Sequence, residues 1–422
     1  MVQVPQFGSI LSAFAVARAA CGSPAFALDT EDGEDLTLSL QVAPPGVSQG
    51  KKADLVVAPE KPEERSDEEP EKKGFFRQFT DEEDGKVDFS NFLAKGGFIP
   101  LPIIITEPAV EGGYGVAAVL LRVPKDNPKN VTRRVIAAFK TRNGSRGFGY
   151  FQSGFAFDGR LNYRFGAGRG KFNLEAFPRF APDGVKYTNH YDYGIMGSAL
   201  WSLGSGFSVG PLLDFRKLKS ELEIAGAPDI FDRDFNDTLH TGALGLGLHF
   251  DSRDNTLTPK NGINAYVEGK FNRGTFGSDR DFEDYDANLF WFRELNPKIR
   301  SAFKLKLDAI RGDYPVYFAP SIELRGVQAI RYQGQNVASS EAELTWQLNK
   351  RWSLLAFGGV GTAKAGGRRI YKDSGLIAAG GGGFRYRLAR KLGLDAGLDL
   401  AYGPGGLVFY IQLGHAWSLR MD

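Results

Sequence analysis

The sequence predicts an all-β protein: a closed antiparallel transmembrane β-barrel of about 16 strands, with a disordered N-terminal tail and a long loop folded inward. Apolar and polar residues alternate over segments longer than the ~5–6 residues usual in soluble sheets, and ~9–11 residues suffice to cross a bilayer. The second face of these segments is rich in glycine and charge, as in a wet lumen. Aromatic residues gather near segment ends, as in interfacial girdles. Alternation alone also fits a soluble β-sandwich or propeller, which is the alternative fold.

The composition agrees with many strands and tight turns. The chain has 53 glycines and 33 phenylalanines, and aromatic residues make up 13% of it. The single cysteine, Cys21, lies in the leader, so the mature chain can form no internal disulfide. No stretch approaches the ~18 apolar residues of a transmembrane helix. The basic residues are too scattered to form a nucleic-acid surface.

The first 112 residues divide into three segments. Residues 1–27 are expected to be a signal peptide, with an apolar stretch at 10–16 and an A-x-A-like cleavage site at 25–27. Residues 28–80 are expected to be a disordered acidic and proline-rich tail, because positions 29–74 hold 13 acidic and 6 basic residues. Residues 81–112 are expected to lead into the barrel.

An acidic block opens this third segment. Its carboxylates do not have the spacing of a calcium loop, so we expect an exposed turn. The block consists of Asp81, Glu82, Glu83, Asp84 and Asp88.

The period-two pattern places the barrel at residues 113–417, followed by a short C-terminal extension at 418–422. The segments can be listed by their approximate ranges: 113–123, 131–142, 147–157, 160–177, 191–204, 206–223, 241–252, 262–273, 283–295, 298–310, 338–348, 352–363, 375–389, 391–403 and 406–417. A bacterial barrel normally has an even number of strands, so about 16 are expected. The additional strand is expected within 97–107 or within 160–177. An even number also places both barrel ends on one side, which should be the periplasm.

Residues 311–337 form a stretch too long for a hairpin turn, and loops of this length are usually functional or disordered. The stretch contains Leu324, Arg325, Gly326 and Val327. This motif resembles the Val-Arg-Gly-Phe loop of the BamA/TamA family of outer-membrane assembly barrels, with Leu for Val and Val for Phe.

Four further stretches of residues 81–417 resemble this family. The turn motif Asp-x-Arg-Asp is matched, the strand after the long loop is matched, and so are the opening and the closing strand. The residues are Asp251, Arg253, Asp254, Pro259 and Gly262 for the turn; Ser340 to Leu344 for the strand; Phe98 to Pro108, Gly112, Gly113, Tyr114 and Gly115 for the opening; and Leu413 to Trp417 for the close.

The resemblance implies that the loop folds into the barrel and that Arg325 pairs with carboxylates of the inner wall, Glu343 or Glu341. A guanidinium in a confined lumen needs a charge-assisted partner, which is consistent with this role. The family's second carboxylate is replaced by Gly359 here, so Arg325 is expected to depend on the glutamates alone, or the loop to be held less firmly.

The resemblance also implies a seam between the first and last strands. The first side is expected at 114–122, with Tyr114 and Gly115, and the second at 407–417, with Leu413, Gly414 and Trp417. No periplasmic POTRA domain is recognisable before the barrel, so a POTRA-less member is expected. This departure puts client handling by the family's usual route in doubt.

The sequence gives no support for an enzyme. The four histidines are scattered without metal-ligand spacing, and neither a complete phosphate loop nor a nucleophile elbow is present. No cofactor and no metal are expected. The resemblance implies a barrel of the Gram-negative outer membrane that assists insertion or translocation of proteins, or of lipids, by lateral opening of the seam. Its expected partners are outer-membrane lipid, lipopolysaccharide and unfolded outer-membrane proteins, and no nucleic acid. A passive pore or a structural barrel is the alternative function.

Overall fold

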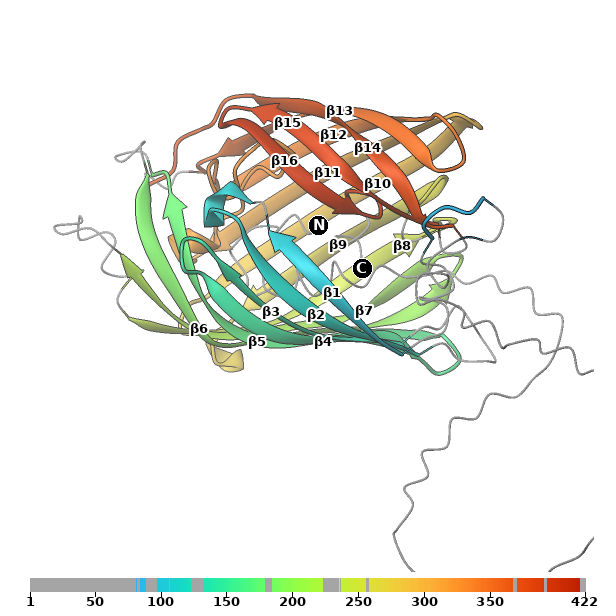
Figure 1. Cartoon of the computed structure of the whole chain (residues 1–422). Coiled ribbons are helices and arrows are strands. Elements are labelled where there is room, and N and C mark those ends of the chain that lie inside the picture. The colour runs from blue at the N-terminus through green and yellow to red at the C-terminus, as the bar shows by residue number, and fades with distance from the viewer. Residues whose placement is uncertain are drawn as a thin grey trace, which may run out of the picture.

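The computed structural model describes residues 81, 84–88, 97–105, 107–122, 132–178, 184–222, 235, 237–255, 258–366, 370–390 and 393–417. These residues form one 16-stranded antiparallel sheet whose strands follow the chain order from β1 to β16. The sheet curls into a nearly closed barrel (Figure 1). The predicted fold class and strand number are therefore confirmed. The expected signal peptide, the acidic tail at 28–80 and the extension at 418–422 lie outside the described residues.

The first eight strands are β1 (Gly97–Ile105), β2 (Gly113–Arg122), β3 (Thr132–Thr141), β4 (Arg146–Ala156), β5 (Leu161–Ala176), β6 (Val185–Gly204), β7 (Phe207–Leu222) and β8 (Thr238–Asp251). The last eight are β9 (Gly262–Asn272), β10 (Phe282–Asn296), β11 (Ile299–Gly312), β12 (Asn336–Gln347), β13 (Trp352–Lys364), β14 (Ile377–Ala389), β15 (Leu394–Gly403) and β16 (Gly406–Leu413). Three short 3-10 turns complete the described elements: η2 (Pro108–Val110), η4 (Gly274–Phe276) and η5 (Val316–Phe318). Among the described residues, no helix is long and apolar enough to span a membrane.

The barrel begins earlier and ends earlier than the sequence pattern predicts. The additional strand that an even number requires is β1, which lies in the first of the two places expected for it, 97–107, and within the segment assigned to the lead-in. At the other end, β16 stops at Leu413 instead of continuing to Trp417. Within the described part of the chain, no ladder joins β16 to β1, so these two strands are the free edges of the sheet (Figure 1).

The two faces of the sheet differ in the way a membrane barrel requires. On β11, Lys304 and Asp308 are 2% and 5% exposed, whereas Leu307 between them is 45% exposed. Soluble proteins rarely bury charged side chains and usually bury leucine. The inverted pattern, in a single curled sheet, excludes the soluble sandwich.

The direction of the strands defines two ends of the barrel. Because neighbouring strands are antiparallel, the start of β1, the end of β16 and the turn between β12 and β13 lie at one end. The long loop after β11 starts at the opposite end. The first end is the chain-end rim, and the second is the loop rim.

An arginine-anchored loop as the candidate functional site

The loop between β11 and β12 is packed inside the barrel. Its side chains Ile322, Leu324 and Val327 are at most 5% exposed and form a cluster with wall residues of β12 and β13. An isolated bridge between Ser321 and Gln333 holds the two arms of the loop together. The loop therefore presents one fixed conformation to the inner wall, as the family resemblance implies.

Arg325 anchors this loop through charge. Its guanidinium Nη2 lies 2.8 Å from Glu341 Oε1 and 2.8 Å from Glu343 Oε2. Nη1 donates a hydrogen bond to Asp399 Oδ2 at 2.9 Å, and the guanidinium stacks 3.5 Å from the centre of the Phe357 ring. Arg325 is only 1% exposed, so these contacts replace its water shell almost completely. Both expected partners are present, and a third carboxylate joins them.

The three carboxylates do not depend on Arg325 alone. Arg385 on β14 donates to both oxygens of Asp399, with Nη2 at 2.9 Å from Oδ2. His415 Nε2 lies 3.2 Å from Glu343 Oε1. The positive side chains thus offset most of the negative charge of the three carboxylates. A buried ionic network needs this, because burying one unpaired charge destabilises the fold by roughly several kcal/mol.

The expectation that the second carboxylate is missing is wrong. Gly359 has no room for an aspartate, because a Cβ placed there would lie 2.7 Å from Leu324 Cδ2 and 2.6 Å from Ser340 O. The leucine of the loop motif fills that space. Asp399, two strands further along the sheet, supplies the charge instead. The sequence offers a weak signal for this residue, since it lies on the polar face of an alternating strand, but nothing in the sequence says which strand faces the loop.

The strand predicted for the first side of the seam is wrong. The prediction for the second side names the right strand but extends it too far. Tyr114 and Gly115 lie on β2, which pairs with β1 and β3 and is therefore an interior strand. Leu413 ends β16, while Gly414 and Trp417 come after the strand. The pattern is misread because the prolines of 97–105 make the true first strand look unlike a strand.

Trp417 turns into the lumen and joins the anchor. It is 1% exposed, packs against Phe290 and Phe292, and donates its Nε1–H to Glu341 Oε1 at 3.0 Å. A residue in the segment after β16 therefore shares a carboxylate with Arg325. This links the segment that follows β16 to the loop.

The loop also contacts both sides of the seam. The N–H of Gly326, a residue at φ +93°, donates to the Tyr410 hydroxyl of β16 at 3.0 Å. Three residues later, the N–H of Ala329 donates to Glu107 Oε1 at 3.2 Å, in the connection between β1 and β2. Glu107 is 4% exposed; it belongs to the opening stretch that resembles the family, but the sequence does not predict its contact with the loop. The loop tip therefore bridges the two free edges.

The turn motif between β8 and β9 lies at the chain-end rim and is fixed by its own hydrogen bonds. Arg253 binds Asp251 through two hydrogen bonds of 2.9 and 2.6 Å. Asp254 accepts from the backbone N–H groups of residues 260 and 261, Pro259 is buried, and Gly262 starts β9 at φ +115°. Pro259 also lines a small pocket together with Glu343 and His415, so the turn lies beside the Arg325 cluster.

The described part of the acidic block forms a turn that is exposed at residues 84–87, as predicted, but its aspartates are not free in solvent as the prediction implied. Asp81, Asp84 and Asp88 surround Arg351, in the turn between β12 and β13, at 2.5, 2.7 and 2.6 Å. The hydrogen bond from Arg351 lowers the pKa of the Asp84 carboxyl to about 2. We call this group the Arg351 clasp. It attaches the segment before β1 to the chain-end rim.

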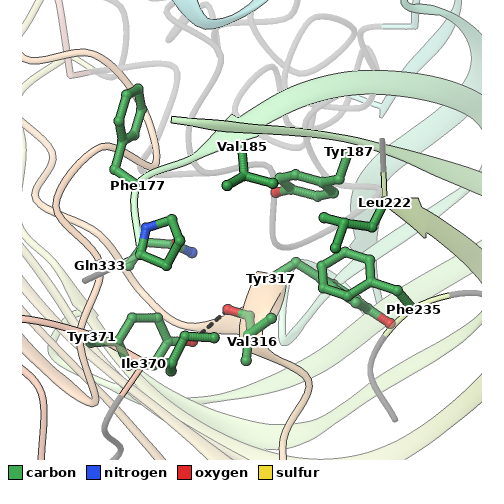
Figure 2. A pocket seen from close by; sticks show the side chains of 11 residues that line it. Phe177, Val185, Tyr187, Leu222, Phe235, Val316, Tyr317, Gln333, Ile370 and Tyr371 are labelled. Atoms are coloured by element: carbon green, nitrogen blue, oxygen red, sulfur yellow. Dashed lines mark hydrogen bonds between the residues drawn. The ribbon is translucent and has the colours of Figure 1, made fainter. Parts of the chain in front are cut away.

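An apolar pocket lies where the loop leaves the wall near the loop rim (Figure 2). Tyr187, Phe235 and Tyr317 form part of its lining, and the Tyr371 hydroxyl donates to Val316 O at 2.5 Å. Its volume of about 30 Å³ is that of one water molecule. The pocket is therefore a packing contact that supports the base of the loop, and it is too small for a ligand.

Comparison with models of known protein families gives no match, and neither does comparison with curated proteins. Solved structures do match. BamA from Haemophilus ducreyi lacking POTRA domains 1–3 aligns at TM-score 0.53 and 12% identity, over 75% of this chain and 70% of that one.

CdiB from Acinetobacter baumannii aligns at TM-score 0.53 and 12% identity, over 75% of this chain and 59% of that one. CdiB from Escherichia coli aligns at TM-score 0.53 and 9% identity, over 74% and 61%. This chain thus spans less than two thirds of either CdiB chain. At these identities the likeness concerns the fold, and the protein has the barrel fold of BamA and CdiB.

Proposed function

We propose that the protein is a Gram-negative outer-membrane barrel that assists insertion or translocation of proteins, or of lipids, by opening the seam between β1 and β16. One observation carries the proposal: a charge-anchored loop contacts both free edges of a sheet in which no described ladder joins those edges. The proposed role is mechanical and not enzymatic. The proposed partners are outer-membrane lipid, lipopolysaccharide and unfolded outer-membrane proteins.

The physical basis is the unsatisfied backbone of the two edge strands. An edge strand presents a row of N–H and C=O groups that can pair with another chain. In hydrocarbon each unsatisfied group costs several kcal/mol, roughly, so an open seam has a strong preference for an added strand. An incoming segment gains main-chain hydrogen bonds by adding to the edge.

The loop is positioned to control this opening. Arg325 fixes it to β12 and β15, which lie on the β16 side of the seam, and Ala329 reaches across to Glu107 on the β1 side. Ile330 of the loop tip belongs to the same buried cluster as Ile103 and Ile105 of β1. Moving β1 away from β16 therefore breaks contacts of the loop tip, while its Arg325 anchor stays in place.

A passive pore or structural barrel is the competing function. The glycine at 359 is one of the two sequence features that favour it, beside the lack of a recognisable POTRA domain. Asp399 removes the first argument only, because it supplies a further carboxylate to Arg325. Steady ion conductance in planar bilayers, unchanged by Arg325→Ala, would favour the pore.

The test uses purified protein in liposomes mixed with an unfolded outer-membrane protein, and it measures the rate at which the client folds. We expect acceleration by the wild type and loss of acceleration with Arg325→Ala. The matched control is Arg387→Ala, which removes a wall arginine paired with Asp395 and leaves the loop untouched. Folding of each variant is checked by heat-modifiable gel mobility. Equal acceleration by all three proteins contradicts the role of the loop, and no acceleration by the folded wild type contradicts the proposed function.

A further inference from the structure

The two edges of the seam differ in their hydrogen-bonding capacity. β1 pairs with β2 in an unbroken register from Gly97 to Ile105, and this register includes Pro100 opposite Ala118 and Pro102 opposite Val116. In an antiparallel ladder, alternate residues direct their N–H and C=O toward one neighbour and the others toward the opposite side. Proline has no N–H to give. The donors that hold β1 to β2 must therefore come from the odd-numbered residues of β1.

The even-numbered residues of β1 then face the seam. Among positions 98, 100, 102 and 104, the two central ones are prolines, so this edge keeps N–H donors only at Phe98 and Ile104. Proline in a sheet is confined to such edges, where it discourages pairing with another strand. The middle of the β1 edge offers carbonyl oxygens but no donors.

β16 has a complete edge. Its eight residues, Gly406–Leu413, contain no proline, so each residue that faces away from β15 offers both an N–H and a C=O. Leu407 and Phe409 are 71% and 50% exposed and point outward, whereas Gln412 is buried on the inner face. Among the described residues, the Gln412 side-chain Nε2 has no hydrogen-bond partner. This edge is therefore apolar toward the membrane, polar toward the lumen, and able to form a full ladder.

We infer that β16 is the edge that receives an incoming strand, and that the prolines of β1 block the same pairing on the other side of the seam. The partner that fits is an extended segment of unfolded polypeptide in which apolar and polar residues alternate, as in a membrane-spanning strand. A spanning strand needs ~9–11 residues, close to the length that β16 offers. The inference rests on the proposed function, because it names the surface on which a client would begin to fold.

Strand addition at β16 also suits the position of the loop. Tyr410, which holds Gly326, alternates with Phe409 and Ile411 and points inward, so its bond to the loop need not break when a strand adds to the outer edge of β16. On the β1 side, the loop tip and Glu107 would have to separate for the edge to become accessible. The β16 edge can thus be used while the anchor stays intact.

The test measures capture of a synthetic peptide by single cysteines in the full chain, reconstituted in liposomes with Cys21 replaced by serine. The peptide alternates apolar and polar residues over about ten positions and carries one activated disulfide. Phe409→Cys reports on β16, Ile104→Cys reports on β1, and Val116→Cys on the interior strand β2 is the control. The side chains at positions 409, 104 and 116 are 50%, 49% and 55% exposed, so differences in thiol access are small.

We expect Phe409→Cys to capture the peptide about 30-fold better than Ile104→Cys, because two backbone hydrogen bonds are missing at the β1 edge. Adding Pro100→Ala and Pro102→Ala should raise capture by Ile104→Cys toward the β16 level. Equal or better capture at unmodified β1, no response to the alanine substitutions, or capture at β16 no higher than at Val116→Cys would each overturn the inference. Cross-linking of Phe409→Cys to a second copy in preference to the peptide would also overturn it.

The client-folding assay separates this inference from the proposed function. If the wild type accelerates client folding while the peptide is captured at β1, the function stands and the assignment of the edge fails. If the wild type gives no acceleration, the proposed function fails whichever edge captures the peptide.

Discussion

Replacing Asp399 with asparagine tests whether this residue is the third carboxylate of the loop anchor, in addition to Glu341 and Glu343. Asn has nearly the same shape, so the substitution removes charge without opening a cavity. Asp399 is fully buried and accepts from Arg325 and Arg385. Breaking a buried ion pair by removing one partner costs about 3–5 kcal/mol. Arg325 keeps both glutamates, so we place the loss for Asp399→Asn at about 3 kcal/mol, the lower end of that range.

The assay combines stability with protection of the loop. Urea unfolding in detergent or liposomes, followed by gel mobility, gives the change in the free energy of unfolding. Trypsin cleavage after Arg331 reports whether the loop still lies inside the barrel. We expect a lower unfolding midpoint together with faster cleavage.

The control is Asp395→Asn, four residues earlier on the same strand. Asp395 is also buried and pairs with Arg387, which does not contact the loop. This variant should lose stability and keep the loop protected. If Asp399→Asn leaves the trypsin rate unchanged, or if both variants expose the loop equally, the assignment of Asp399 to the anchor is refuted.

The remaining predictions concern the space beside the loop, its tip and the chain-end rim. Gly359→Asp should destabilise the barrel by about 1–3 kcal/mol through overpacking against Leu324, and it should not restore activity to Asp399→Asn; urea midpoints and client-folding rates check this. Glu107→Gln keeps an acceptor for the N–H of Ala329, whereas Glu107→Ala removes it. Only the alanine variant should therefore speed capture of the peptide by Phe409→Cys. Equal rates in the two variants would contradict the bridge between the loop tip and Glu107. The Arg351 clasp should be complete at pH 7 and open as the pH falls from about 4 toward 2, because the pKa of Asp84 is lowered in the folded protein. The anisotropy of a dye attached to the segment before β1 should fall in that pH range. In Arg351→Ala it should be low at every pH.

Local features of the sequence suffice to predict the strands of this protein. Alternation of side chains and the turn residues between strands are properties of neighbouring residues, so fifteen predicted segments overlap strands of the structure. β1 differs, because the sequence gives its place only as one of two alternatives for the additional strand, and the prolines explain why. Prolines 100 and 102 conflict with an interior strand, yet they are compatible with an edge, and a strand can be recognised as an edge only once the whole sheet is known.

The parts of the anchor differ in how far the sequence reveals them. The motif identifies Arg325, and the next strand supplies Glu341 and Glu343 within a short stretch of chain. Asp399 lies 74 residues from Arg325, and the carboxylates that bind Arg351 lie more than 260 residues from it. Such pairs depend on which strands the barrel places opposite each other, and a single sequence contains no record of that arrangement.

The anchor, the loop tip and the unequal edges together explain how one barrel could combine a stable wall with an opening seam. The Arg325 cluster joins β12 and β15 along the inner wall through a fully buried network, so this part of the wall resists deformation. On the β1 side, the loop tip is held by the hydrogen bond from Ala329 and by apolar packing, and the seam edge of β1 lacks its central donors. The Arg351 clasp holds only the segment before β1, at the chain-end rim. A force that opens the seam should therefore displace β1 first and leave β16 in place. The edge that stays in place is the one with a complete set of hydrogen-bonding groups, which is the arrangement that strand addition requires.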